Sequence, residues 1–363
     1  MIRTLSLLSA LALIAACSSG DDGSNPFDPP PEEEEGGTDT DGGGEESGDG
    51  QETDPIGEDD GALPPGTPNP TPDDSITRYE ERDERGDGFA EAPNYNADDD
   101  TFEVDNLPFD GDNVYDRDDQ VASLGPPGGT GPFAVYENPQ TLTDPVSGEE
   151  IQQVPNKLLF QRSDSGLTEV VVVRSAGYAN EFGFGGWAYQ RNGGVELPQT
   201  LQATFTGDYA ALRDFDTRAG LEYATGMIEL DVDWEDFNGT STENAIKGSI
   251  TDRRIFDVAG NDITQQWLDA LGEEADRPFD QLPTVNVVIA PGTIDQNGEI
   301  STAVASGYVD GEGEVQEYEA GALNAILAGD VPDEIVGIVE MESDDLIAGD
   351  GNVRETGGFI ADR

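Results

Sequence analysis

An alternation of apolar and polar residues is the clearest pattern in the chain. From Ile228 to Glu235 every even position is apolar and every odd position is acidic. Because successive side chains of a strand point to opposite faces, this segment predicts an antiparallel strand with one buried and one charged face. Similar segments predict further strands at Gln202–Thr206, Ala245–Ile250, Thr284–Ile289, Thr302–Val309 and Glu334–Met341.

A hairpin and a helix are also predicted. Lys157–Gln161 and Glu169–Val173 are apolar runs that flank the turn residues Asp164-Ser165-Gly166. Farther along, Asp262 is a candidate N-cap for a helix in which Ile263, Trp267 and Leu271 share one face, ahead of Gly272.

Many short strands, frequent turn signals and a single helix predict an all-β fold. Turns such as Phe237-Asn238-Gly239 and Gln296-Asn297-Gly298 separate the strands of the C-terminal half. An antiparallel barrel or a sandwich fits this pattern, and closure of a barrel leaves no sheet edge exposed. We expect folded structure from about Phe89 onward, with β-rich residues 89–184 ahead of the main domain.

The first residues have a different character. Arg3 precedes an apolar run from Leu5 to Ala16, and Cys17 follows. A spanning helix needs roughly 20 apolar residues, so this shorter run predicts a signal peptide over 1–16. The signal peptide can be of the lipoprotein type, in which the cysteine is acylated, or an ordinary secretory signal that is followed by a cysteine by chance. Cys17 is the only cysteine, which excludes an intramolecular disulfide.

From residue 17 to residue 88 the chain is dominated by Asp, Glu, Gly, Pro, Ser and Thr. Low hydrophobicity and repulsion between like charges leave the entropy of ordering uncompensated, so this segment predicts a disordered acidic tether. The whole chain has 17 basic and 78 acidic residues, a net charge of −61 and no histidine. Nucleic-acid binding is excluded on charge, and histidine-dependent nucleophilic or metal chemistry is excluded by composition.

Carboxylate chemistry remains open, and we weighed several candidates. Asp164-Ser165-Gly166 matches an aspartic-protease triplet but is also an ordinary turn. The row Glu229, Asp231, Asp233 and Glu235 is a candidate for a carboxylate pair or calcium, against a solvated strand face. The denser acidic loops are also calcium candidates, against plain acidic turns; they contain Asp98-Asp99-Asp100, Asp110-Gly111-Asp112-Asn113, Asp116, Asp118 and Asp119. An aromatic run is a candidate stacking platform or a piece of barrel wall; it contains Tyr178, Phe182, Phe184, Trp187 and Tyr189. We assign no catalytic, cofactor or metal residue from these patterns.

Two resemblances add to this picture. Ile14-Ala15-Ala16-Cys17 resembles the lipobox of bacterial lipoproteins, which implies cleavage before Cys17, a diacylglycerol thioether and acyl chains such as palmitate. Ser18 then implies delivery to the outer membrane. Residues 185–363 resemble the barrel domain of transferrin-binding-protein-B-type surface lipoproteins, on motifs at Gly185-Gly186-Trp187, Ala203–Tyr209, Ala245–Ile250 and Glu355–Ala361.

The second resemblance implies an eight-stranded barrel and a non-enzymatic binding module at the cell surface, often an accessory of an outer-membrane transporter for iron or haem. Its expected partners are the membrane, through the lipid on Cys17, and an extracellular protein, haem or a metal-bearing ligand. The chain departs from the family in having one barrel, no histidine and a far greater acidity. A carboxylate-based surface hydrolase and a structural or adhesive surface protein are the alternatives.

Overall fold

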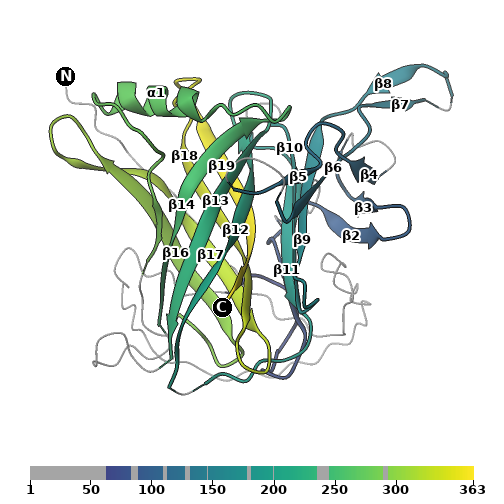
Figure 1. Ribbon diagram of the computed structural model, residues 1–363. Helices are drawn as coiled ribbons and strands as arrows, with labels where there is room; N and C mark the ends of the chain where they lie inside the picture. Colours follow the sequence, from purple (N-terminus) through teal and green to yellow (C-terminus); the bar gives the residue numbers. More distant parts are fainter. Residues whose placement is uncertain are drawn as a thin grey trace, which may run out of the picture.

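The computed structural model describes residues 63–82, 89–108, 113–126, 131–144, 146–177, 181–198, 200–234, 245–288 and 293–363. Cys17 and the signal peptide lie outside the described residues. Two β structures lie side by side: a closed eight-stranded antiparallel barrel and a nine-stranded antiparallel sheet (Figure 1). Both confirm the all-β class and the C-terminal barrel. Within the described ranges, no helix has the length and apolar content needed to cross a membrane.

The barrel holds the C-terminal strands in sequence order, and its last strand pairs with its first. Its strands are β12 (Gln202–Phe215), β13 (Glu222–Asp233), β14 (Ala245–Asp257), β15 (Val285–Val287), β16 (Glu299–Val309), β17 (Val315–Ala328), β18 (Glu334–Asp344) and β19 (Asn352–Asp362). The single helix of the described chain, α1 (Thr264–Glu274), connects β14 to β15 and covers one end of the barrel (Figure 1).

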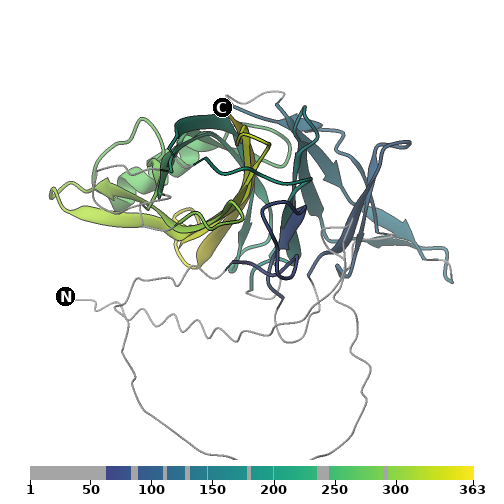
Figure 2. The same cartoon turned by 90° about the horizontal axis from the view of Figure 1, so that it is seen from below.

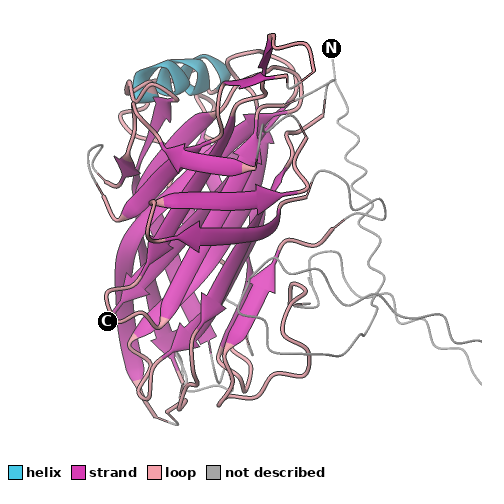
Figure 3. Ribbon diagram, turned by 90° about the vertical axis from the view of Figure 1, so that its right-hand side faces the viewer, coloured by secondary structure: helices cyan, strands magenta, loops and turns pink. Residues whose placement is uncertain are grey.

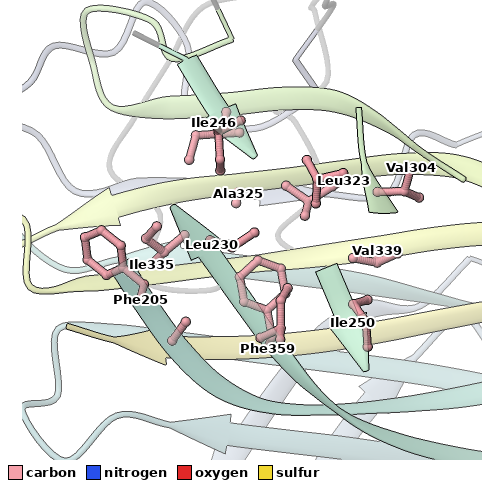
Figure 4. Packing of buried hydrophobic residues seen from close by; sticks show 14 of the residues in the cluster. Phe205, Leu230, Ile246, Ile250, Val304, Leu323, Ala325, Ile335, Val339 and Phe359 are labelled. Carbon is pink, nitrogen blue, oxygen red and sulfur yellow. The ribbon is translucent and has the colours of Figure 1, made fainter. Parts of the chain in front are cut away.

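Apolar side chains fill the interior of the barrel. On β13 the even-numbered Ile228, Leu230 and Val232 point inward, as the alternation predicts. They pack in one buried cluster with Leu323 of β17 and Phe359 of β19, which are fully buried (Figure 4). Seen along its axis, the barrel forms a ring with the N-terminal sheet along one side (Figure 2).

The N-terminal sheet has the order β1-β11-β10-β9-β6-β4-β3-β2, with β5 paired to β6. Its strands are β1 (Ile76–Tyr79), β2 (Glu91–Asn96), β3 (Thr101–Asp105), β4 (Val114–Arg117), β5 (Ser123–Leu124), β6 (Phe133–Glu137), β9 (Asn156–Arg162), β10 (Thr168–Ser175) and β11 (Gly185–Arg191). A separate hairpin of β7 (Thr141–Thr143) and β8 (Glu150–Gln152) projects from this sheet. The β9–β10 pair is the hairpin predicted around Asp164-Ser165-Gly166.

One face of this sheet packs against the outer wall of the barrel. The buried cluster between them joins sheet residues such as Val170 and Trp187 to barrel residues such as Leu212 and Ile338. Gly358 of β19 allows this approach, since a Cβ there would lie 2.7 Å from Cγ2 of Val170. The two β structures therefore share a core.

The structure corrects two of the expected boundaries. We assigned residues 17–88 to the acidic tether, but Ile76 in β1 is fully buried and β1 pairs with β11, so folded structure begins before Phe89. We also began the barrel at residue 185, whereas β11 belongs to the sheet and the barrel begins at Gln202. In both cases a strand of the sheet comes from a segment whose local composition indicated something else.

The structure adds one strand and corrects one helix cap. The sequence pattern does not predict β17, because its residues from Leu323 to Ala328 do not alternate between apolar and polar. Leu323 and Leu327 face the interior while Ile326 faces the sheet, so both faces are apolar there. In α1, Trp267 and Leu271 are buried as expected, but the N-cap is Ile263; Asp262 precedes it and accepts a hydrogen bond from the backbone N–H of Thr264 at 2.9 Å.

Candidate ligand-binding site

Two rows of side chains cross the face of the sheet that points away from the barrel. Directly paired residues of β9, β10 and β11 form an apolar row of Phe160, Val171 and Ala188. A polar row runs parallel to it, displaced by two residues along each strand, and consists of Arg162, Glu169 and Gln190. Thr77 of β1 extends this row. Because residues two apart share a face of a strand, the two rows lie next to each other on one surface.

Hydrogen bonds and one ion pair connect the polar row. Gln190 Nε2 donates to Glu169 Oε2 at 3.1 Å, and Thr77 Oγ1 donates to Gln190 Oε1 at 3.4 Å. Arg162 Nε lies 3.2 Å from Glu169 Oε1, but the Arg162 side chain is 58% exposed, whereas that of Glu169 is only 25% exposed. Glu169 is therefore held on one side by an amide and on the other by a solvated guanidinium.

In the view from this side, short strands cross in front of the long strands (Figure 3). The β2–β3 hairpin brings two aromatic side chains onto Phe160 of the apolar row. Tyr95 of β2 stacks on Phe160 with ring centroids 5.6 Å apart, and Phe102 of β3 meets Phe160 edge-on at 5.1 Å. A pocket of about 220 Å³ remains beside them, lined by Asn94, Tyr95, Phe160, Val171, Glu169 and Gln190 among others. We call this pocket the aromatic slot.

Asp100, in the turn of the β2–β3 hairpin, fixes the position of Tyr95. Its carboxylate accepts hydrogen bonds from the hydroxyls of Tyr95 at 3.1 Å and Tyr136 at 2.7 Å, and from Nε of Arg117 at 3.1 Å. Burial opposes ionisation of Asp100, but the bonds from Tyr136 and Arg117 outweigh it and lower its pKa. The slot is therefore roofed by an aromatic ring that is anchored at its hydroxyl end.

The structure gives the other acidic candidates of the N-terminal region structural partners. Asp118 is buried and binds Lys157 Nζ at 2.5 Å. Asp98 and Asp99 lie in the exposed hairpin turn, where Asp99 accepts a hydrogen bond from Asn96. Asp116 is in β4, and residues 110–112 lie outside the described residues. Over the described ranges, no group of three acidic or cysteine side chains is arranged to hold a metal ion.

The predicted acidic face of β13 is only partly solvated. Glu229 is exposed, but Asp231 binds Lys247 Nζ at 3.1 Å and Asp233 is fully buried, where its carboxylate accepts a hydrogen bond from Gln202 Nε2 at 2.7 Å. Glu235 lies outside the described residues. These carboxylates stabilise neighbouring strands instead of converging on one point.

Asp164-Ser165-Gly166 is the exposed turn between β9 and β10, and Gly166 has a φ of 74°, which suits a turn glycine. Burial raises the pKa of the Asp362 carboxyl, and the nearby charges of Glu334 and Asp164 add to this effect. Glu334 accepts a hydrogen bond from Thr168 Oγ1 at 2.7 Å. The negative charge of Asp164 in this turn therefore repels the carboxylate of Asp362.

The aromatic run divides between the two faces of the sheet. Trp187 and Tyr189 of β11 stack at 6.0 Å on the face toward the barrel, whereas Phe184 packs on the opposite side. The barrel-wall interpretation of this run is therefore wrong, because Trp187 and Tyr189 belong to β11 of the neighbouring sheet. Tyr178 lies outside the described residues.

A network of buried charges, which the sequence did not reveal, lies in the end of the barrel covered by α1. The guanidinium of Arg253 binds Glu319 Oε1 at 2.7 Å and Glu355 Oε2 at 2.9 Å, and Arg213 binds Glu222 Oε2 at 2.8 Å. Burial opposes ionisation of Glu319, but Arg253 outweighs it and lowers the pKa of this carboxyl. Because the paired side chains come from β12, β13, β14, β17 and β19, the network joins strands across the barrel end.

No protein-family model and no curated protein matches the chain. Among solved structures, it is similar to a mutant of the vaccine antigen transferrin binding protein B from Haemophilus parasuis Hp5, at 13% identity and a TM-score of 0.32, over 61% of this chain and 40% of that one. A double mutant of the same antigen matches at 13% identity and a TM-score of 0.32, over 64% of this chain and 37% of that one. Intact Ap-TbpB, with its N and C lobes, matches at 10% identity and a TM-score of 0.34, over 75% of this chain and 43% of that one. The chain spans less than half the length of these proteins, which belong to the family that its sequence resembles. At these identities and TM-scores, the likeness says nothing about what this chain binds.

Proposed function

We propose that this chain is a lipid-anchored binding protein of the bacterial outer membrane, which captures an extracellular ligand without chemically changing it. The observation that carries the proposal is the aromatic slot. It is a preformed concave surface with apolar walls and a few polar groups, which is the usual composition of a ligand site. The interior of the barrel is filled by its own side chains and leaves no room for a ligand there, which favours the slot on the sheet.

The sequence adds the anchor and the distance from the membrane. The lipobox-like residues before Cys17 supply an acylation site, and more than one acyl chain holds a protein firmly to a bilayer. Residues 17–62, which are acidic and poor in apolar residues, then separate the anchor from the folded part. An accessory role beside a transporter for iron, haem or another solute is the specific form of this proposal, and it follows from the family resemblance.

Expression of the full chain in a diderm bacterium tests the anchor and the location. We expect incorporation of an acyl label that is lost in Cys17→Ser, and cleavage of the protein when intact cells are treated with protease. Label that persists in Cys17→Ser would contradict the anchor, and full protection from protease would contradict exposure at the surface.

Ligand capture tests the binding role. The purified mature protein, incubated with growth medium from iron-limited and iron-replete cultures, should retain a component that is released unaltered. Turnover of the retained component, abolished by changing one carboxylate to an amide, would favour a hydrolase instead. Recovery of nothing under either condition would contradict an acquisition role.

A further inference from the structure

We propose that the aromatic slot binds one lysine or arginine side chain of the ligand protein, with the cationic group at Glu169 and the stem along Phe160 and Val171. This inference rests on the proposed binding function and specifies the chemistry of the partner. It follows from the size of the slot, the groups in it and the charge around it.

The size of the slot fits one long side chain. Its volume is about 220 Å³, below the range of about 300–1,000 Å³ that small-molecule sites occupy. Lysine and arginine place their methylene stems on apolar surface while the charged end stays at the edge. The apolar row of Phe160, Val171 and Ala188 lies beside the polar row in the orientation that such a side chain requires.

The groups at the edge favour a cation. The carboxylate of Glu169 is already bound by Gln190 and points along the polar row toward Arg162. The Arg162–Glu169 pair has a 3.2 Å contact and a largely exposed guanidinium, and an ion pair with a solvated partner contributes little because water screens the attraction. An incoming guanidinium or ammonium can therefore replace Arg162 at little cost, and the aromatic rings that line the slot attract it further.

The charge of the whole molecule acts in the same direction. The chain has a net charge of −61, and many of its arginines are buried against their own partners, as with Arg78 and Glu299 at 2.5 Å or Arg174 and Glu80 at 2.7 Å. A negative surface concentrates basic partners near it and repels anionic ones. A neutral side chain would fill the slot but gain nothing from this field.

Blocked pentapeptides with one central residue among glycines provide the probes for the test, added to the full-length mature protein and followed by ligand-observed NMR. Peptides with arginine or lysine should bind, and peptides with citrulline or norleucine, their uncharged counterparts, should bind at least about tenfold more weakly. Free propylguanidinium and butylammonium distinguish a small cation from a peptide segment. Their binding as tightly as the peptides would overturn the assignment to a protein segment.

Variants locate the binding in the slot. Glu169→Gln and Tyr95→Ala should each weaken binding by about tenfold or more, whereas Glu150→Gln, which removes an exposed charge from β8, should leave it within twofold. Arg162→Gln should strengthen binding by about two- to fivefold because it removes the internal competitor. Equal losses in Glu150→Gln and Glu169→Gln, or no gain in Arg162→Gln, would refute the proposal.

The same variants separate this inference from the proposed function. A natural ligand retained undiminished by a folded Glu169→Gln variant would leave the binding function intact and refute the role of the slot. Peptide binding that follows the predicted order, without any captured natural ligand, would support the slot and contradict the acquisition role. Thermal unfolding of each variant shows whether a loss of binding reflects a loss of folding.

Discussion

The barrel and the N-terminal sheet are both antiparallel, but the barrel is closed and the sheet is open. Seven of the eight barrel strands have 11–14 residues, and their inward side chains close into one filled core. The strands of the sheet have 2–8 residues, and the β2–β3 hairpin packs over part of their outer face. A closed, filled barrel has no free interior surface, whereas an open sheet can present part of one face to a ligand. The comparison predicts that substitutions in the barrel mainly affect stability and substitutions at the slot mainly affect binding.

The largest effect should come from the barrel core. Phe359→Ala removes a fully buried ring from the interior and should lower the free energy of unfolding by about 3–5 kcal/mol, through lost burial and the cavity left behind. Chemical denaturation measures this change. Val315→Ala, at a position 80% exposed, is the control and should change stability by no more than about 0.5 kcal/mol. A loss below about 1 kcal/mol in Phe359→Ala would show that the barrel is not the stabilising unit.

The buried network should come next. Arg253→Met leaves Glu319 and Glu355 without their shared cation, and removal of one partner from a buried pair costs about 3 kcal/mol or more. Arg254→Met is the matched control, because Arg254 binds Asp262 through an ion pair in which both side chains are more than 40% exposed. That variant should lose less than about 1 kcal/mol. Similar losses in both variants would mean that the network has no special role.

The sheet offers a smaller effect that depends on pH. Burial opposes ionisation of Asp118, but the bond from Lys157 and two backbone N–H groups outweigh it and lower its pKa below the usual 3.8. The resulting stability is present above the pKa of the unfolded chain and is lost as pH falls through the lower folded value. Asp118→Asn should therefore be less stable by about 1–2 kcal/mol at pH 7, and the difference from the original protein should shrink between about pH 5 and pH 2. Denaturation across this range measures it, and a constant difference would refute the assignment.

The smallest effect on stability should come from the slot itself. Tyr95 is 39% exposed, and its ring contacts and the bond to Asp100 predict a loss of about 1 kcal/mol in Tyr95→Ala. The same substitution should abolish most peptide binding. Tyr95→Ala should therefore affect binding much more than stability, whereas Phe359→Ala should affect stability much more than binding. A loss of stability as large as that of Phe359→Ala would indicate that the hairpin is part of the core and not a roof over a site.

Local patterns predicted the elements that have one apolar and one polar face. The alternation on β13, the β9–β10 hairpin and the apolar stripe of α1 are visible from residues close together in the chain, because burial on one side imposes the period of a strand or helix. β17 was missed for the complementary reason: a strand covered on both faces has no polar period to reveal it.

The sequence by itself determined the all-β class, the acidic character of the protein, the absence of histidine chemistry and the candidate acylation site at Cys17. Only the tertiary structure decided that β1 joins the sheet, that Arg253 meets Glu319 and Glu355, and that Thr77, Gln190, Glu169 and Arg162 form one row. These contacts depend on strand pairing and register between distant segments. A shift of one residue would place the polar row on the opposite face of the sheet, and no local pattern fixes that choice.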